Sequence, residues 1–252
     1  MSLASIDSRG FPISLSRVMI DPELIIFDCD GVLIDSEVIS ARQLIAELQG
    51  YGVEMDMAFV SRHFLGRSYP VVLAEVRDRW GVALPDRFEA DYRARLLAAF
   101  ERDLQVMPGV IDTLASLRLP YCLATSSSPE RLRRSLDITG IARWFDGCAF
   151  TASEVARGKP APDLFLHAAA RMGTTPDACI VIEDSLNGLR AGLAAGMQVW
   201  RFTGGSHLAG IDLTAPPDAT PHASYADFST LRDSHPDLFA AAPTPVTCRV
   251  PS

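Results

Sequence analysis

Residues 24–36, with the sequence LIIFDCDGVLIDS, decide the fold of this chain. The first four residues are apolar and do not alternate with polar ones, which predicts a short strand buried on both faces. Asp28 and Asp30 follow directly, and Gly31 permits a sharp bend after them. An isolated D-x-D pair would more simply form an Asx turn, but a buried strand that ends in two carboxylates also suits a functional site at a sheet edge.

Two further apolar runs also end in polar residues. Residues 121–124 lead into Thr125 and Ser126, and residues 179–182 lead into Glu183 and Asp184. Weaker candidate strands lie at 148–150 and 198–202, and segments with helical periodicity lie at 109–117, 131–137, 162–172 and 186–195. Strands alternating with helices predict an α/β protein with a parallel sheet. Because the carboxyl ends of parallel strands meet at one edge, we expect these polar side chains to lie close together.

The segment from Glu37 to Met107 breaks the alternation of strands and helices. It has helical periodicity at 38–49, 69–80 and 86–101 and contains no convincing strand. We therefore expect a helical domain, residues 37–107, inserted into a core formed by 21–36 and 108–240. Residues 1–20 are expected to be a flexible extension, and the proline-containing residues 241–252 a loose tail.

Composition limits the classes of partner. The 252 residues carry a net charge of −8 and no basic run, which disfavours nucleic acid and anionic membrane surfaces. No apolar stretch approaches about 18–20 residues, so no transmembrane helix is expected. Five cysteines without C-x-x-C spacing predict reduced, mostly buried thiols and a cytoplasmic protein. We expect a monomer or small homo-oligomer that binds a small molecule.

The acidic residues at the predicted sheet edge indicate a metal site. Four carboxylates, those of Asp28, Asp30, Glu183 and Asp184, would repel one another, by about 4 kcal/mol for two charges 4 Å apart at an effective dielectric of 20. Ligands that are all oxygen favour a hard cation, and Mg²⁺ is the natural choice. Because Mg²⁺ usually binds one or two carboxylates together with a substrate phosphate, the pattern points to phosphoryl chemistry.

Lys159 is the one lysine among 23 basic residues. It lies in the sequence Gly158-Lys159-Pro160, a stiff loop before a predicted helix. Most lysines are solvated surface residues, but a chain that elsewhere uses arginine has kept a compact ammonium here. We therefore expect Lys159 to contact a phosphate and a carboxylate nucleophile together.

Taken together, these motifs resemble the four motifs of the haloacid dehalogenase superfamily. They are D-x-D-G-V-x-x-D-S from Asp28, Thr125 after the second strand, G-K-P-x-P-D around Lys159, and E-D-S-x-x-G from Glu183. The closest resemblance is to the phosphatase and β-phosphoglucomutase-like subfamily, and it spans about residues 23–203. It implies a Rossmann-like core with a helical cap inserted after the first strand.

The resemblance also implies a role for each motif residue. Asp28 would be the nucleophile that forms an aspartyl-phosphate, and Asp30 would protonate the leaving oxygen and then activate water. Thr125 and Ser126 would hold phosphate oxygens, and Lys159 would neutralise charge. The implied ligands of Mg²⁺ are Asp28, the carbonyl of Asp30, Asp184, and Glu183 directly or through water.

The same motifs separate the reactions of the superfamily. Dehalogenases of this fold lack the second aspartate, so Asp30 argues against dehalogenation. The related mutase has a histidine near the cap hinge where this chain has Ser40, and its cap arginine corresponds to Arg67 displaced by about two positions. We therefore expect a Mg²⁺-dependent phosphatase acting on a sugar phosphate or phosphorylated organic acid. A phosphomutase and, more remotely, a non-catalytic phosphometabolite-binding protein remain alternatives.

The cap offers the candidates for contact with the leaving group. Arg62, Arg67 and Ser68 are those candidates, although an exposed cap surface would explain them equally well. The four histidines outside the cap have no recognisable metal spacing and are expected at the surface; they are His167, His207, His222 and His235.

Overall fold

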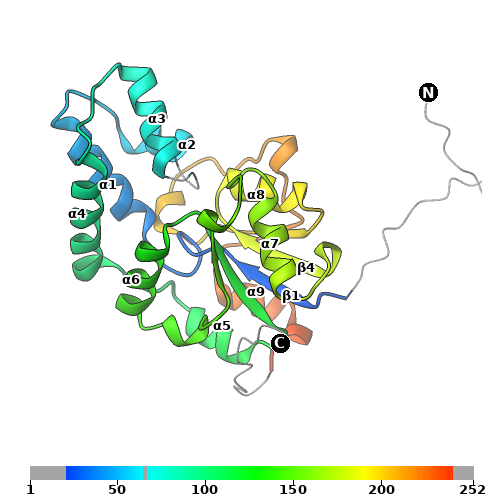
Figure 1. The fold of residues 1–252 in the computed structure, drawn as a ribbon. Coiled ribbons are helices and arrows are strands. Elements are labelled where there is room, and N and C mark those ends of the chain that lie inside the picture. Colours follow the sequence, from blue (N-terminus) through cyan, green and yellow to red (C-terminus); the bar gives the residue numbers. More distant parts are fainter. Residues whose placement is uncertain (1–20, 65–66, 68, 241–252) are drawn as a thin grey trace, which may run out of the picture.

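The computed structural model describes residues 21–64, 67 and 69–240; the side chains of 61 and 62 are not described. Within these residues, six strands form one parallel sheet in the order β3-β2-β1-β4-β5-β6 (Figure 1). The strands are β1 (Leu24–Phe27), β2 (Tyr121–Thr125), β3 (Ala149–Thr151), β4 (Cys179–Glu183), β5 (Gln198–Phe202) and β6 (Ala223–Tyr225). The expected flexible extension, 1–20, and loose tail, 241–252, lie outside the described residues.

Helices lie on both sides of the sheet and in an insert beside it (Figure 1). The helices of the core are α5 (Val110–Ser116), α6 (Pro129–Thr139), α7 (Asp163–Arg171), α8 (Leu186–Ala194) and α9 (Phe228–Ser234). The helices of the insert are α1 (Glu37–Gln49), α2 (Met57–His63), α3 (Tyr69–Trp80) and α4 (Phe88–Asp103). The expected α/β fold with a Rossmann-like sheet and an α-helical insert is confirmed.

The sheet places the ends of β1 and β4 next to each other. Phe27 pairs with Ile182, and the backbone N–H of Asp28 donates to the carbonyl of Ile182 at 2.9 Å. All four side chains of β1 are buried, as expected for a strand covered on both faces. The strand order reverses between β1 and β4, and ligands of open α/β sheets bind beyond the carboxyl ends of the strands at such a point.

The three strong apolar runs are strands within one residue of their expected ends. The weaker strand expected at 148–150 lies one residue later. Three short elements were not predicted: β6, α2 and α9. Ala223–Tyr225 is three residues long and only its last side chain is buried, so its sequence carries no strand pattern. It pairs with β5 at the edge of the sheet, and only the tertiary structure reveals it.

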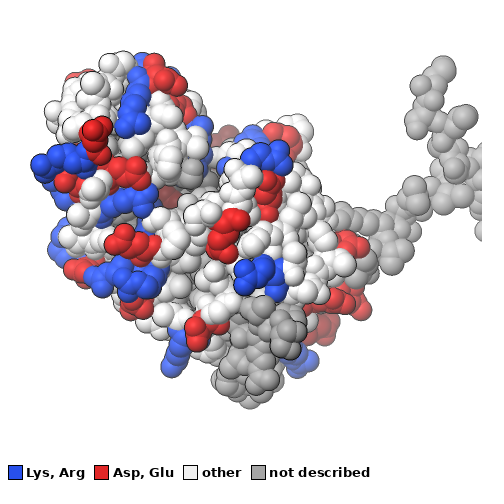
Figure 2. All heavy atoms as spheres, viewed as in Figure 1, with Lys and Arg blue, Asp and Glu red and all other residues white. Residues whose placement is uncertain are grey.

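The insert forms its own packed layer. α1 and α4 contact each other through buried apolar side chains, among them Leu44, Leu48, Leu96 and Phe100. The rings of Tyr69 and Tyr92 stack with centroids 4.7 Å apart. Positive and negative side chains are interspersed over the face of the insert in Figure 2. The boundaries of this domain, 37–107, stay a prediction.

Three of the cysteines, Cys29, Cys122 and Cys179, are free and buried, as expected. Cys29, between the two aspartates in the sequence, is 1% exposed. Cys148 is disulfide-bonded, which corrects the expectation of a reduced thiol there, and Cys248 lies outside the described residues. None of the helices in the described ranges has the length and apolar character that a membrane crossing requires.

Candidate active site

Asp28 and Lys159 form the buried floor of the site. The Lys159 Nζ donates to Asp28 Oδ1 at 2.6 Å, to Glu183 Oε1 at 2.9 Å and to the carbonyl of Ala124 at 3.1 Å. The side chain of Lys159 is 1% exposed and lies over the ring of Phe165. The structure therefore places the one lysine of the chain in contact with the first aspartate of the D-x-D motif.

Three carboxylates gather around this ammonium. The ligand atoms of Asp28, Glu183 and Asp184, all buried, lie within 4.8 Å of one another. When all are ionised, three carboxylates and one ammonium leave two negative charges, which one divalent cation would balance. The donors are oxygens throughout, as a hard cation such as Mg²⁺ prefers. These residues therefore fit the metal that the sequence motifs imply.

Burial and mutual repulsion dominate the electrostatics of this cluster. Burial raises the pKa of Asp28 well above its ordinary value, against the attraction of Lys159, and the neighbouring carboxylates raise it further. Burial and Glu183 likewise raise the pKa of Asp184. Burial acts to lower the pKa of Lys159, but Asp28 and Glu183 outweigh it and the pKa is raised, so the ammonium stays charged.

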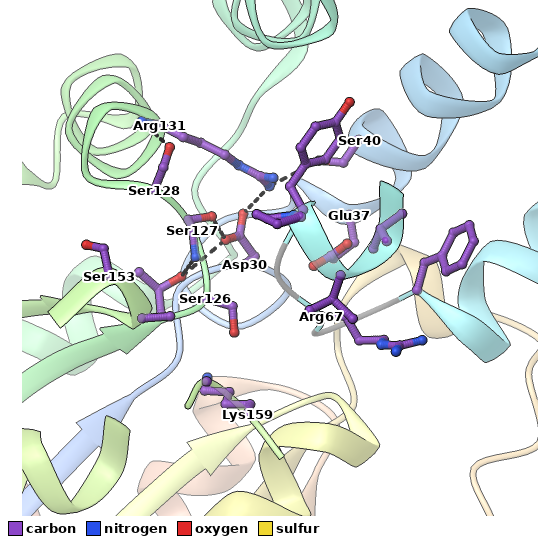
Figure 3. A pocket seen from close by; sticks show the side chains of 18 of the residues that line it. Asp30, Glu37, Ser40, Arg67, Ser126, Ser127, Ser128, Arg131, Ser153 and Lys159 are labelled. Atoms are coloured by element: carbon purple, nitrogen blue, oxygen red, sulfur yellow. Dashed lines mark hydrogen bonds and ion pairs between the residues drawn. The ribbon is translucent and has the colours of Figure 1, made fainter. Parts of the chain in front are cut away.

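Asp30 accepts hydrogen bonds from three sides. Its Oδ1 accepts from Arg131 Nη2 at 2.7 Å, and its Oδ2 accepts from Ser127 Oγ at 2.6 Å (Figure 3). Its Oδ1 also accepts from Ser36 Oγ at 2.5 Å. Burial acts to raise the pKa of this carboxyl, but Arg131 and the two hydroxyls outweigh it and the pKa is lowered. The guanidinium and hydroxyl donors around Asp30 thus favour its ionised form.

Thr125 and Ser126 lie where β2 turns into α6. The backbone N–H of Ser127 donates to Thr125 Oγ1 at 3.0 Å, and Ser128 caps α6 by accepting from the N–H of Arg131. Pro129, in the first turn, suits the start of a helix. Thr125 and Ser126 line the same cavity as Asp28 and Lys159. The structure thus brings together the five residues predicted from the first three motifs.

A cavity of about 600 Å³ lies between these residues and the insert. Asp28, Asp30 and Lys159 line its floor, and the insert contributes Tyr69 and Tyr92 to its wall. Figure 3 shows side chains of both parts converging on this space.

Of the three insert residues predicted to contact the substrate, Arg67 is the one whose side chain the structure describes. Arg67 lines the cavity, but its guanidinium pairs with Glu75 and donates to the carbonyl of His63 at 3.2 Å. Figure 3 shows it pointing away from Asp30. The side chain of Arg62 and all of Ser68 lie outside the described residues. Contact of these three residues with a substrate stays a prediction.

Three residues of the site region were not predicted. Arg131, in the first turn of α6, donates to Asp30 and to Ser40 Oγ. The sequence signal that could have indicated it is its position shortly after Thr125. Glu37 lines the cavity, and burial together with the charge of Asp30 raises its pKa to about 8. His207 was expected at the surface but is 5% exposed, which corrects that expectation.

His207 lies against the acidic cluster. Its Nε2 is 2.8 Å from Asp184 Oδ2, and burial lowers its pKa. It belongs to a short 3₁₀ turn (Ser206–Leu208) after β5. The sequence gives no sign that the loop after the fifth strand returns to the ends of the first and fourth.

Comparison with known proteins identifies the family. The haloacid dehalogenase-like hydrolase family matches residues 22–196, and the chain belongs to this family. The match extends from just before β1, across the insert, to the end of α8.

Similarity to named proteins indicates which kind of hydrolase the chain is. The 6-phosphogluconate phosphatase of Escherichia coli (strain K12) is 31% identical over 187 residues, 73% of this chain and 84% of the relative. A probable pseudouridine-5'-phosphatase of Drosophila melanogaster is 34% identical, over 85% of this chain and 92% of the relative. A haloacid dehalogenase-like protein of unknown function from Agrobacterium tumefaciens has a similar structure (TM-score 0.71, 32% identity, 86% and 98% of the two chains). The chain is a phosphoric monoester hydrolase of this family.

Proposed function

We infer that this chain is a Mg²⁺-dependent phosphatase that hydrolyses a small phosphate monoester through an aspartyl-phosphate on Asp28. The observation that carries the proposal is the position of Asp28. It lies at the floor of the cavity, 2.6 Å from the buried Lys159 ammonium and within the cluster that contains Glu183 and Asp184. A carboxylate held this way is set up to attack a phosphorus atom placed in the cavity above it.

Asp28, Asp184 and the carbonyl of Asp30 would hold Mg²⁺, with Glu183 direct or through water. When bound, the ion offsets negative charge on the carboxylates and on the phosphoryl oxygens. Lys159 adds a positive charge beside Asp28. Thr125 and Ser126 would hold phosphate oxygens from the end of β2. Most of the catalytic work of these residues is positioning and charge stabilisation.

In the first half-reaction, an Asp28 carboxylate oxygen attacks phosphorus and the bond from phosphorus to the ester oxygen breaks. Asp30, protonated for this step, donates its proton to the leaving oxygen, so an alcohol departs. In the second, Asp30 takes a proton from water, whose oxygen attacks phosphorus. The bond from phosphorus to Asp28 breaks, releasing inorganic phosphate and the free carboxylate. Asp30 accepts bonds from Arg131, Ser36 and Ser127 in this structure, the arrangement that suits its role as base.

The substrate proposal is a sugar phosphate or a phosphorylated organic acid. The relatives named for 6-phosphogluconate and for pseudouridine 5'-phosphate support a small phosphorylated metabolite. Residues 37–107 would act as the cap over the site and exclude water on closing. The pairing of Arg67 with Glu75 supports hydrolysis over phosphomutase activity, because that guanidinium is engaged within the insert. A cytoplasmic location and a monomer or small homo-oligomer stay predictions from the sequence.

A panel of phosphorylated sugars, sugar acids and nucleosides tests the function. With Mg²⁺ we expect release of inorganic phosphate from a subset of the panel, and with excess EDTA we expect none. Both the phosphate and the organic product are measured. Isomerisation of a sugar 1-phosphate without phosphate release would establish a mutase instead. Absence of turnover across the panel, with ligands still raising the melting temperature, would establish a binding protein.

A further inference from the structure

His207 is a buried polar side chain next to the site, and the proposed reaction gives it no task. It is 5% exposed, and neither ring nitrogen has a hydrogen-bond partner of acceptable geometry among the described residues. Its Nε2 nevertheless lies 2.8 Å from Asp184 Oδ2. Leaving a buried polar group unpaired costs about 1–3 kcal/mol, so its retention here calls for a partner in the working state.

The structure holds this imidazole in a tight space between two glycines. A Cβ at Gly31 would lie 2.1 Å from Asp184 Oδ2 and 2.8 Å from His207 Cε1. A Cβ at Gly205 would lie 2.5 Å from His207 Cε1. The backbone at Gly31 has φ +82°, a conformation that favours glycine. Both neighbours of the ring are therefore residues without a side chain, and any other residue at either position would displace the ring.

The loop that carries His207 is anchored at a second point. The N–H and Oγ of Ser206 donate to Asp35 Oδ1 at 3.2 and 2.8 Å. Arg201, at the end of β5, donates to the backbone carbonyl of Asp184 at 3.3 Å. The loop is thus tied to the first motif by Ser206, and it brings His207 Nε2 to Asp184 Oδ2. These anchors fix the imidazole against one oxygen of Asp184.

We propose that His207 is a positioning residue for the metal site. Its Nε2–H donates to Asp184 Oδ2 when the metal is bound and leaves the other carboxylate oxygen to bind the ion. The inference rests on the metal site of the proposed function. Outer partners of this kind orient ligating side chains, and their loss commonly weakens metal binding 10–100-fold.

Direct binding of the metal by His207 is the competing interpretation. Among the described residues, the group whose ligand atoms all lie within 4.8 Å of one another consists of Asp28, Glu183 and Asp184, and does not include His207. Its nearest contact in the cluster is Asp184. These contacts therefore favour a role for His207 in orienting Asp184 over a role as a fourth ligand to the ion.

The test measures metal binding without substrate, so its outcome is independent of whether the chain is a phosphatase. Isothermal titration with Mg²⁺ and with Mn²⁺ is run on the full chain and on His207→Ala, His207→Asn and His207→Gln. The Gln amide nitrogen can reach the place of Nε2, whereas Asn is too short. We expect both dissociation constants to rise 10–100-fold in the Ala and Asn variants and to return to within about threefold of the parent in Gln.

The matched control is His167→Ala, which removes a half-buried imidazole on α7 that contacts Glu154, and it should bind both ions like the parent. Melting in EDTA verifies that each variant is folded, and the Asn and Gln pair decides the question if the Ala variant is not. Dissociation constants in the Asn variant within twofold of the parent for both ions would overturn the proposal. A loss in the Ala variant much larger for Mn²⁺ than for Mg²⁺ would also overturn it, in favour of a nitrogen ligand.

Discussion

The ion pairs on the floor of the cavity differ from those in its wall, which the insert forms. On the floor, the cations of Lys159 and Arg131 pair with Asp28 and Asp30, residues that face the cavity. In the wall, Arg67 pairs with Glu75 and Arg93 pairs with Glu89, both within the insert itself. On the proposed function, the charged groups of the floor take part in the reaction, whereas those of the wall mainly pair with one another.

Asp28→Asn removes the proposed nucleophile and should have the largest effect on turnover. An amide oxygen is a poor nucleophile, so kcat should fall by about 10⁴-fold or more. Phosphate release under saturating substrate and Mg²⁺ measures this, with Asp137→Asn on the exposed face of α6 as the matched control. Turnover in the Asn variant within tenfold of the parent, with the fold intact, would remove Asp28 from the mechanism.

Lys159→Arg keeps the charge and changes the shape. The ammonium contacts three oxygens in a space closed by the ring of Phe165, and the forked guanidinium does not fit the same contacts. We expect kcat to fall roughly 10²–10³-fold, the range for loss of one well-placed group that stabilises charge. The control is Arg133→Lys, an exposed residue of α6, which should retain activity. Parent-like turnover in Lys159→Arg would show that charge alone suffices.

Glu37 lines the cavity where the floor meets the insert. Glu37→Gln tests whether the carboxyl of Glu37 is protonated in the folded chain. The folded pKa is about 8, above the ordinary value near 4.5, so the folded chain holds a proton that the unfolded chain releases between these values. The stability of the parent relative to Glu37→Gln should therefore be highest at pH 5 and fall as pH rises to 8.5. The side chain is partly exposed, so we expect a change of about 1–2 kcal/mol.

Urea unfolding in EDTA at the two pH values measures this difference. Glu54→Gln, an exposed residue of the insert, is the control and should show the same pH dependence as the parent. An equal pH dependence in the parent and in Glu37→Gln would mean that the carboxyl of Glu37 is ionised throughout.

Arg67→Ala tests the wall and should have the smallest effect. Its partner is Glu75, and half-exposed ion pairs of this kind contribute about 0–1 kcal/mol. We expect kcat/KM to change less than about threefold, with a slightly lower melting temperature. Glu75→Gln, which removes the other half of the pair, should behave alike. A loss of tenfold or more in kcat/KM for Arg67→Ala alone would show that this residue leaves Glu75 and contacts the substrate.

The floor and the wall of the cavity also differ in how far the sequence predicts their residues. Asp28 directly follows β1, and Thr125 and Glu183 are the last residues of β2 and β4. In a parallel sheet such residues meet at one edge. Lys159 stood out because lysine is otherwise absent. These signals are local, which is why these four residues could be predicted from the sequence although Arg131 could not.

The missed residues depend on tertiary structure. His207 reaches Asp184 only because Ser206 docks on Asp35, a contact between residues 171 positions apart. Arg131 lies on a helix whose rotation decides whether it faces Asp30. The partner of Arg67 depends on how α2 and α3 meet. Periodicity gives the existence of such helices but not these contacts.

The central claim is a covalent phosphoryl group on Asp28, and chemical trapping tests it most directly. The enzyme is quenched in acid during turnover and treated with borohydride, which reduces an acyl phosphate and leaves free carboxylates intact. Peptide mapping then locates the reduced residue. The account predicts homoserine in place of Asp28 only when substrate and Mg²⁺ are present, and none in Asp28→Asn. Reduction at a different carboxylate during turnover, with Asp28 unchanged, would contradict it.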